Sequence, residues 1–147
     1  MSATARLTEL GIELPPVAAP AGAYLPAVRT GSLVFTAGQV PKGAEPGKVG
    51  AEVSEADAKA HARTCALQAL AAVDALVGLD SVVRVVKVVG FVASAPGFTG
   101  QPAVVNGASE LLGEVFGEAG AHARSAVGVA ELPLGVPVEV ELIVEVR

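Results

Sequence analysis

The segment AHARSAVGVAELPLGVPVEVELIVEV, residues 121–146, decides the fold. From Val138 to Val146 it alternates apolar residues with glutamate, with Ile143 as the exception, and this alternation is typical of a strand with one buried and one polar face. Residues 124–130 are small or apolar and predict another strand, and the Pro- and Gly-containing stretch between the two predicts a turn. We therefore expect a sheet whose valine side meets the helices.

Arg124 opens the first of these strands, and the nearest acids along the chain are Glu118 and Glu131. If the two strands pair as a hairpin, Arg124 shares a face with the glutamates of the last strand, and Ala126 and Gly128 leave space beside it. A cation beside carboxylates and missing side chains indicates a site for a small anion, because an arginine can hold a carboxylate with two hydrogen bonds. The alternative is a solvated Arg–Glu contact on the sheet surface.

The elements outside this segment follow from hydrophobic periodicity and from turn residues. Residues 1–23 end in a Pro-, Ala- and Gly-rich stretch, which predicts an extended lead-in. Ser54 with the acids after it predicts the start of a helix, and Gly78 its end. The other predicted elements are a hairpin (24–40), a strand (80–93) and a second helix with Pro102 in its first turn that runs to about Phe116. The order β-β-α-β-α-β-β predicts an α+β fold with both helices on one face of one sheet, in a single domain spanning 1–147.

Composition limits the classes of function. Of the 147 residues, 52% are hydrophobic and 17% charged, so either the surface is rich in small residues or another subunit covers a large apolar face. The net charge is −5, the basic residues form no run, and there is no Trp. Nucleic-acid binding favours a basic stripe and aromatic side chains that stack on bases, so we do not expect it here.

The single cysteine, Cys65, precludes an internal disulfide and fits a reducing compartment. The N-terminus has no apolar core of signal-peptide length, and the longest apolar run is interrupted by Arg84 and Lys87. We therefore expect a cytoplasmic protein without a membrane span. His61 and His122 lie far apart without the spacing of metal ligands, so we expect no metal and no cofactor.

Four groups of short segments occur in order between residues 22 and 146: GAYLPAV, LVFTAGQVP, FVASAPGF with VNGASELL, and ARSAVGVAELPLGVPVEVELIVEV. Together they resemble the RidA/YjgF family, also described as L-PSP endoribonuclease-like. The resemblance implies a chorismate-mutase-like α+β fold. It also implies a homotrimer with three ligand sites in the clefts between subunits, which would explain the apolar composition.

The resemblance further implies hydrolysis of reactive 2-imino and 2-enamino acids to 2-keto acids and ammonia, without a cofactor. At the matching positions, Arg124 would bind the substrate carboxylate, Glu139 would help to activate water, and Tyr24 would close the site from the neighbouring subunit. The other positions implied to contact the substrate are Gly38, Ala126 and Asn106.

Three positions depart from the family pattern. Ala37 replaces the usual Ser, Ala126 replaces a frequent Cys, and Gly128 replaces a common acid. With its extra residues near 42–53 and 95–102, the chain resembles a longer, divergent branch. Two alternatives therefore stay open: a non-catalytic trimer that binds small carboxylates in a regulatory role, and a ribonuclease. The negative charge and the lack of a catalytic His pair count against the ribonuclease.

Overall fold

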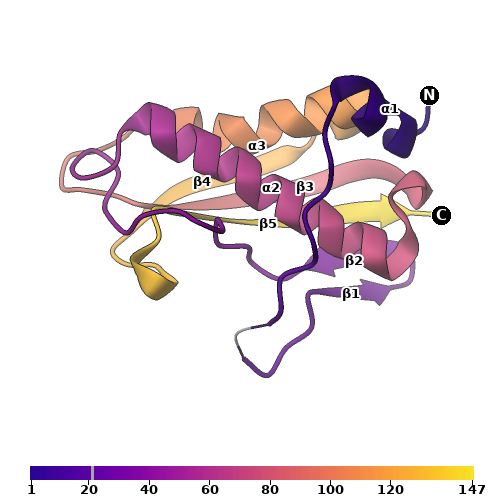
Figure 1. The fold of residues 1–147 in the computed structure, drawn as a ribbon, viewed down its shortest axis with the longest axis horizontal. Coiled ribbons are helices and arrows are strands. Elements are labelled where there is room, and N and C mark those ends of the chain that lie inside the picture. Colours follow the sequence, from indigo (N-terminus) through magenta and orange to yellow (C-terminus); the bar gives the residue numbers. More distant parts are fainter. Residues whose placement is uncertain (21) are drawn as a thin grey trace.

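Five strands form one sheet, and two long helices cover one of its faces (Figure 1). The computed structural model describes residues 1–20 and 22–147. The strands are β1 (Ala27–Thr30), β2 (Leu33–Thr36), β3 (Val82–Ala93), β4 (Ala123–Val129) and β5 (Val138–Val146), and the helices are α1 (Ala3–Leu10), α2 (Glu55–Val77) and α3 (Gln101–Phe116). Short 3₁₀ turns follow α2 (Leu79–Ser81) and α3 (Gly117–Gly120), and a third precedes β5 (Pro133–Gly135). The α+β fold predicted from the sequence is confirmed.

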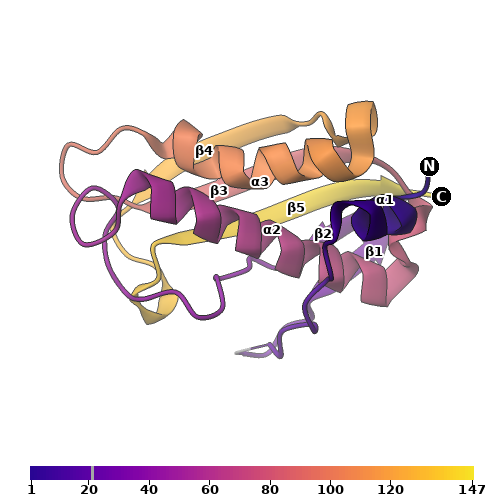
Figure 2. The ribbon, with the colours of Figure 1, turned by 45° about the horizontal axis from the view of Figure 1, so that its top comes forward.

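The sheet order is β1-β2-β5-β3-β4, with β4 parallel to β3 and the other neighbours antiparallel. The helices α2 and α3 lie side by side on the same face (Figures 1 and 2). We call the other face, which no described helix covers, the open face. The N- and C-termini lie at the same end of the molecule (Figure 2).

The alternation of β5 is confirmed residue by residue. Val138, Val140, Leu142, Val144 and Val146 are all buried against the helices. The glutamates between them are only half-buried and lie on the open face. The core therefore fills the layer between the sheet and the helices.

The helix α2 begins and ends where its capping residues predict. The Ser54 hydroxyl accepts a hydrogen bond from the Asp57 backbone N–H at 3.0 Å, and Gly78, at φ 80°, follows the last helical residue. The glycine takes a left-handed conformation that other residues adopt only with strain. Both ends of the predicted helix are confirmed.

The prediction of an extended lead-in over 1–23 was wrong for its first part, where α1 forms. The Ser2 hydroxyl caps this helix by accepting from the Ala5 backbone N–H at 3.1 Å, and Gly11 ends it in a left-handed conformation. The prolines restrict only the residues from 15 onward.

The Asp80 carboxylate docks α1 onto the domain. It accepts hydrogen bonds from the Thr4 backbone N–H and from the Thr4 hydroxyl, both at 2.9 Å, and these bonds hold the pKa of Asp80 below its usual value. Arg6 attaches the other side of the helix, because its Nε donates to the Glu114 carbonyl of α3 at 2.9 Å.

The predicted hairpin between the last two strands was also wrong. β3 separates β4 from β5, so the two strands that follow each other in sequence are not neighbours in the sheet. β4 is instead the parallel partner of β3, joined to it through α3 as in a β-α-β unit. This pairing turns Arg124 toward the helices and leaves Val127 43% exposed on the open face.

Candidate functional site

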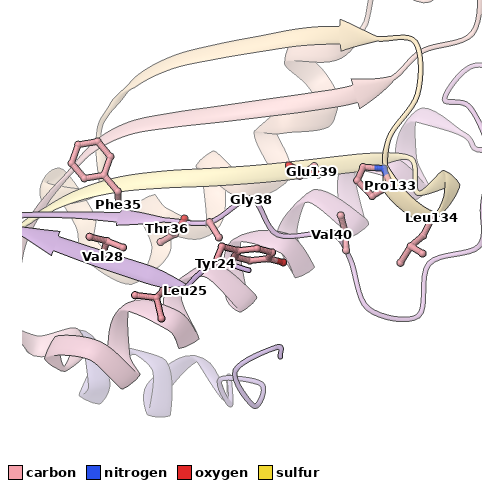
Figure 3. Close-up of a pocket in the computed structure, with 11 residues that line it drawn as sticks. Tyr24, Leu25, Val28, Phe35, Thr36, Gly38, Val40, Pro133, Leu134 and Glu139 are labelled. Atoms are coloured by element: carbon pink, nitrogen blue, oxygen red, sulfur yellow. The ribbon is translucent and has the colours of Figure 1, made fainter. Parts of the chain in front are cut away.

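A hollow with a volume of about 750 Å³ lies at the start of β5. Its wall comes from the segment at Tyr24, from β1 and β2 with the residues that follow β2, and from β5 with its preceding turn (Figure 3). Tyr24, Gly38 and Glu139, three of the residues predicted for the site, line it together. We call this region the Glu139 half-site.

Gly38 lets the Glu139 side chain lie directly against the chain after β2. A Cβ atom at position 38 would collide with Oε2 of Glu139 and lie 2.9 Å from its Cδ. The two segments are also joined by hydrogen bonds between the backbones of Gln39 and Val140, at 2.8 and 3.1 Å. Residue 38 therefore acts through its missing side chain, and the carboxylate occupies the space this leaves.

Burial raises the pKa of Glu139 above the usual carboxyl value, and the nearby Glu141 raises it further. The group is about half-buried in a hollow that also exposes apolar side chains such as Phe35. A carboxylate with a raised pKa is a stronger base than a solvated one, so it takes a proton from water more readily.

A buried amide that the sequence analysis missed supports this half-site from α2. Gln68 donates from Nε2 to the Val40 carbonyl at 2.8 Å, and its Oε1 accepts from the Lys42 backbone N–H at 2.9 Å. These bonds fix the chain just after Gly38. The available signal was a single glutamine among the apolar residues on the buried side of α2.

Arg124 does not line the hollow around Glu139; it lies where β4 contacts α3. Its Nη1 donates to the Asn106 side-chain oxygen at 2.7 Å and to the Ser109 hydroxyl at 3.2 Å. Asn106 and Ser109 are one turn apart on α3, so both face the same strand. Among residues 1–20 and 22–147, no carboxylate lies within 4.0 Å of the guanidinium. We call this region the Arg124 half-site.

The prediction that Arg124 and the glutamates share a face was wrong within one chain. Arg124 is in register with Val88 and Leu142 on the helix side, whereas Glu139 is in register with Phe91 and lies on the open face. The structure thus pairs Arg124 with Asn106, which the resemblance placed only among the residues that contact the substrate, and not with Glu139.

The space expected beside Arg124 is largely filled by the chain itself. Ala126 packs against the core. At Gly128, an added Cβ would lie 3.0 Å from both the Ser94 hydroxyl and the Gln101 side-chain amide. These small residues therefore allow close packing of the strand and do not create an empty cavity.

Ser109 and His122 are two further polar residues of the Arg124 half-site. In the structure the Ser109 hydroxyl lies 2.9 Å from Nε2 of His122. The available signal was the pair of polar residues, Asn106 and Ser109, three apart in a helix that is otherwise apolar on that side.

The cysteine and the possible metal ligands form no further site in the described structure. Cys65 is fully buried, and burial, with a further contribution from Glu139, raises the pKa of its thiol far above the usual range. Within the described part of the chain, no three His, Cys, Asp or Glu side chains gather closely enough to hold a metal ion. No helix there is long and apolar enough to cross a membrane.

The chain belongs to the Endoribonuclease L-PSP family, whose model matches residues 16–146. The match confirms the family that the sequence segments indicated. Protein TCP17 of Trypanosoma cruzi is 49% identical over 97% of this chain and 93% of that protein.

Solved structures show the same fold. A protein of unknown function from Agrobacterium tumefaciens is 44% identical, with a TM-score of 0.90 over 99% of this chain and 92% of that chain. The YjgF protein of Escherichia coli is 33% identical, with a TM-score of 0.63 over 91% and 94% of the two chains. TdcF of E. coli, solved with bound serine, is 28% identical, with a TM-score of 0.62 over 91% and 94%.

Proposed function

We propose that the protein hydrolyses reactive 2-imino and 2-enamino acids to 2-keto acids and ammonia. Arg124 carries this proposal, because its half-buried guanidinium is held by Asn106 and Ser109 but has no carboxylate partner in the described chain. An arginine fixed in this way suits the carboxylate of a small substrate. The serine bound to the related TdcF, an amino acid with a carboxylate, supports the same class of ligand.

In the proposed reaction, Arg124 holds the substrate carboxylate and Glu139 accepts a proton from water. The water oxygen bonds to the imine carbon, and Glu139 returns its proton to the nitrogen, which gives a carbinolamine. The hydroxyl proton of the carbinolamine then passes to the nitrogen as the carbon–nitrogen bond breaks, so ammonia leaves and the 2-keto acid remains. The imine carbon is already electrophilic, so orientation and a proton acceptor suffice. The raised pKa of Glu139 suits it to this role.

The proposal requires two copies of the chain, since β3 and the sheet itself separate Arg124 from Glu139. We propose that the Arg124 half-site of one copy meets the Glu139 half-site of the next in a homotrimer, with Tyr24 contributed by that neighbour. Such a head-to-tail contact closes into a ring of identical sites. The exposed apolar side chains of Val28, Phe35 and Val127 on the open face support burial by another subunit.

The direct test is hydrolysis of freshly generated 2-iminopropionate by the wild type, Arg124→Ala and Arg63→Ala. Arg63 is the control because it pairs with Glu114 on the outer side of the helices. We expect wild type and control to accelerate imine loss. Arg124→Ala should lose roughly 30-fold or more, the usual effect of removing one partner of a desolvated charge pair. A wild-type rate equal to the buffer blank would refute the deaminase.

Two other functions, an endoribonuclease and a regulatory carboxylate-binding protein, can be distinguished from the deaminase with the same wild-type and variant proteins. The family description favours an endoribonuclease. That function requires RNA cleavage that survives stringent purification and disappears in Arg124→Ala, although the net charge of −5 disfavours RNA binding. A regulatory carboxylate-binding protein would bind pyruvate without hydrolysing the imine.

For the deaminase we propose a cytoplasmic location, where the single thiol of Cys65 stays reduced.

A further inference from the structure

A chain of hydrogen bonds leads away from Arg124 and is not used by the proposed reaction. Nη1 of Arg124 donates to the Ser109 hydroxyl at 3.2 Å, and this hydroxyl lies 2.9 Å from Nε2 of His122. Nδ1 of His122 lies 2.6 Å from the carbonyl oxygen of Gly120. The three side chains are all half-buried. They link the carboxylate anchor to an imidazole, a side chain that can be neutral or carry a proton on both ring nitrogens.

The partners fix the direction of each bond when His122 is neutral. The Gly120 carbonyl can only accept, so Nδ1 carries the proton and Nε2 is an acceptor. The Ser109 hydroxyl then donates to Nε2 and accepts from Arg124. Neutral His122 therefore directs the Ser109 hydrogen away from any ligand that binds at Arg124.

Protonation of His122 reverses the bond between His122 and Ser109. Nε2 then donates to the hydroxyl, whose oxygen accepts from His122 and from Arg124 and whose own hydrogen becomes available to an anion. A second positive charge also lies one hydroxyl group away from the guanidinium. Both changes favour a carboxylate at Arg124.

The other charged groups around His122 leave this effect in place. Arg84 of β3 and Glu145 of β5 line the same shallow hollow of about 600 Å³, one of each sign, and Glu118 lies in the turn before His122. The acids of α3 are engaged elsewhere, in ion pairs with α2: Lys59–Glu110 at 3.0 Å and Arg63–Glu114 at 3.2 Å. The hollow gives His122 access to protons from solvent.

We propose that Ser109 and His122 are positioning residues that couple the proton on His122 to the affinity of Arg124 for carboxylates, so that binding strengthens as the pH falls. This inference rests on the proposed role of Arg124 as the carboxylate anchor. It does not depend on turnover of an imine.

The test is calorimetric binding of pyruvate to the full-length protein at pH 5.5 and 7.5 and constant ionic strength. All proteins carry Glu139→Gln, because a titrating Glu139 in the same composite site would also change anion binding. We expect about 3- to 10-fold tighter binding at pH 5.5, the size of effect that one nearby charge gives at the edge of a protein. His122→Gln should abolish this difference, and Ser109→Ala should reduce it to the part that the charge of His122 supplies. His61→Gln, which changes the other histidine, should keep it.

Equal affinity at both pH values would overturn the coupling, as would a pH difference that persists in His122→Gln. If Ser109→Ala keeps the full difference in affinity between the two pH values and His122→Gln loses it, the part assigned to the Ser109 hydroxyl would be overturned. His122→Asn serves as a second variant if His122→Gln does not fold. Failure of the Glu139→Gln parent protein, in which Arg124 is intact, to bind pyruvate at either pH would refute Arg124 as the anchor, and with it the proposed function. Binding that does not change with pH refutes only the coupling.

Discussion

Glu139 is held in place by the absence of a side chain at Gly38. The carboxylate lies where a Cβ at position 38 would be, so its orientation depends on a residue that contributes no atoms of its own to the chemistry. The hollow around it excludes part of the surrounding water and raises its pKa. The same burial that suits Glu139 to be a base therefore makes its ionised form unfavourable in the folded protein.

Replacing Glu139 should separate these two effects. We expect Glu139→Gln to lower imine hydrolysis by roughly 10²- to 10⁴-fold, the usual contribution of a general base. The pKa is raised on folding, so ionised Glu139 lowers stability once the pH exceeds its folded pKa. Glu139→Gln should thus melt at a higher temperature than the wild type at pH 7, and this difference should vanish below the usual carboxyl range. A lower melting temperature at pH 7 would contradict this account.

At this scale the sequence predicted most members of the site but not all of their contacts. Tyr24, Gly38 and Glu139 line one hollow, and Asn106, also named from the sequence, binds Arg124, a contact that was not predicted. Gln68 and the Ser109–His122 pair were missed, because a polar residue on an apolar helix face is only a weak local signal and does not show which distant residue it contacts.

The helix α3 is the element that places the Arg124 half-site, and its position depends on close contact with α2. Gly107 of α3 faces the Lys59 carbonyl of α2, and a Cβ there would collide with that oxygen and lie 2.9 Å from its carbon. Because the obstacle is backbone, rotation of a side chain cannot relieve it. The glycine therefore sets the distance between the helices.

Gly107→Ala should destabilise the protein by about 1–3 kcal/mol, the range for an overpacked core. The matched control is Gly113→Ala in the same helix, where nothing lies within 4 Å of the added Cβ. The control should stabilise the protein by about 0.5–1 kcal/mol, since alanine favours helix over glycine. Urea unfolding measures both. Equal free energies of unfolding for the two variants would refute the close approach.

Element types and most boundaries could be predicted because hydrophobic periodicity and capping residues are local signals. The bounds of β5 agree with the prediction, and so do both ends of α2. The face of β4 could not be predicted in this way. Its residues are small on both sides, so the alternation is weak, and its side chains are oriented by pairing with β3 rather than with β5.

At the scale of the whole molecule, the two half-sites lie on different faces of one sheet, and that sheet leaves apolar side chains exposed on its open face. In the proposed assembly, a neighbouring copy buries that face, and Arg124 of one copy meets Glu139 of the next. The apolar composition left such a partner open, and the family resemblance implied sites between subunits. The sequence could not show that one chain separates Arg124 from Glu139, because this depends on β3 lying between β4 and β5.

The most direct test of the shared site is to mix two inactive variants. Arg124→Ala and Glu139→Gln are unfolded together, refolded as a 1:1 mixture and assayed with 2-iminopropionate. In a ring of shared sites, about one quarter of the sites receive an intact Arg124 from one copy and an intact Glu139 from the next. We therefore predict recovery of about one quarter of wild-type activity, with mixed assemblies visible by native mass spectrometry. Mixed assemblies that stay as inactive as the separate variants would contradict a site formed between two copies.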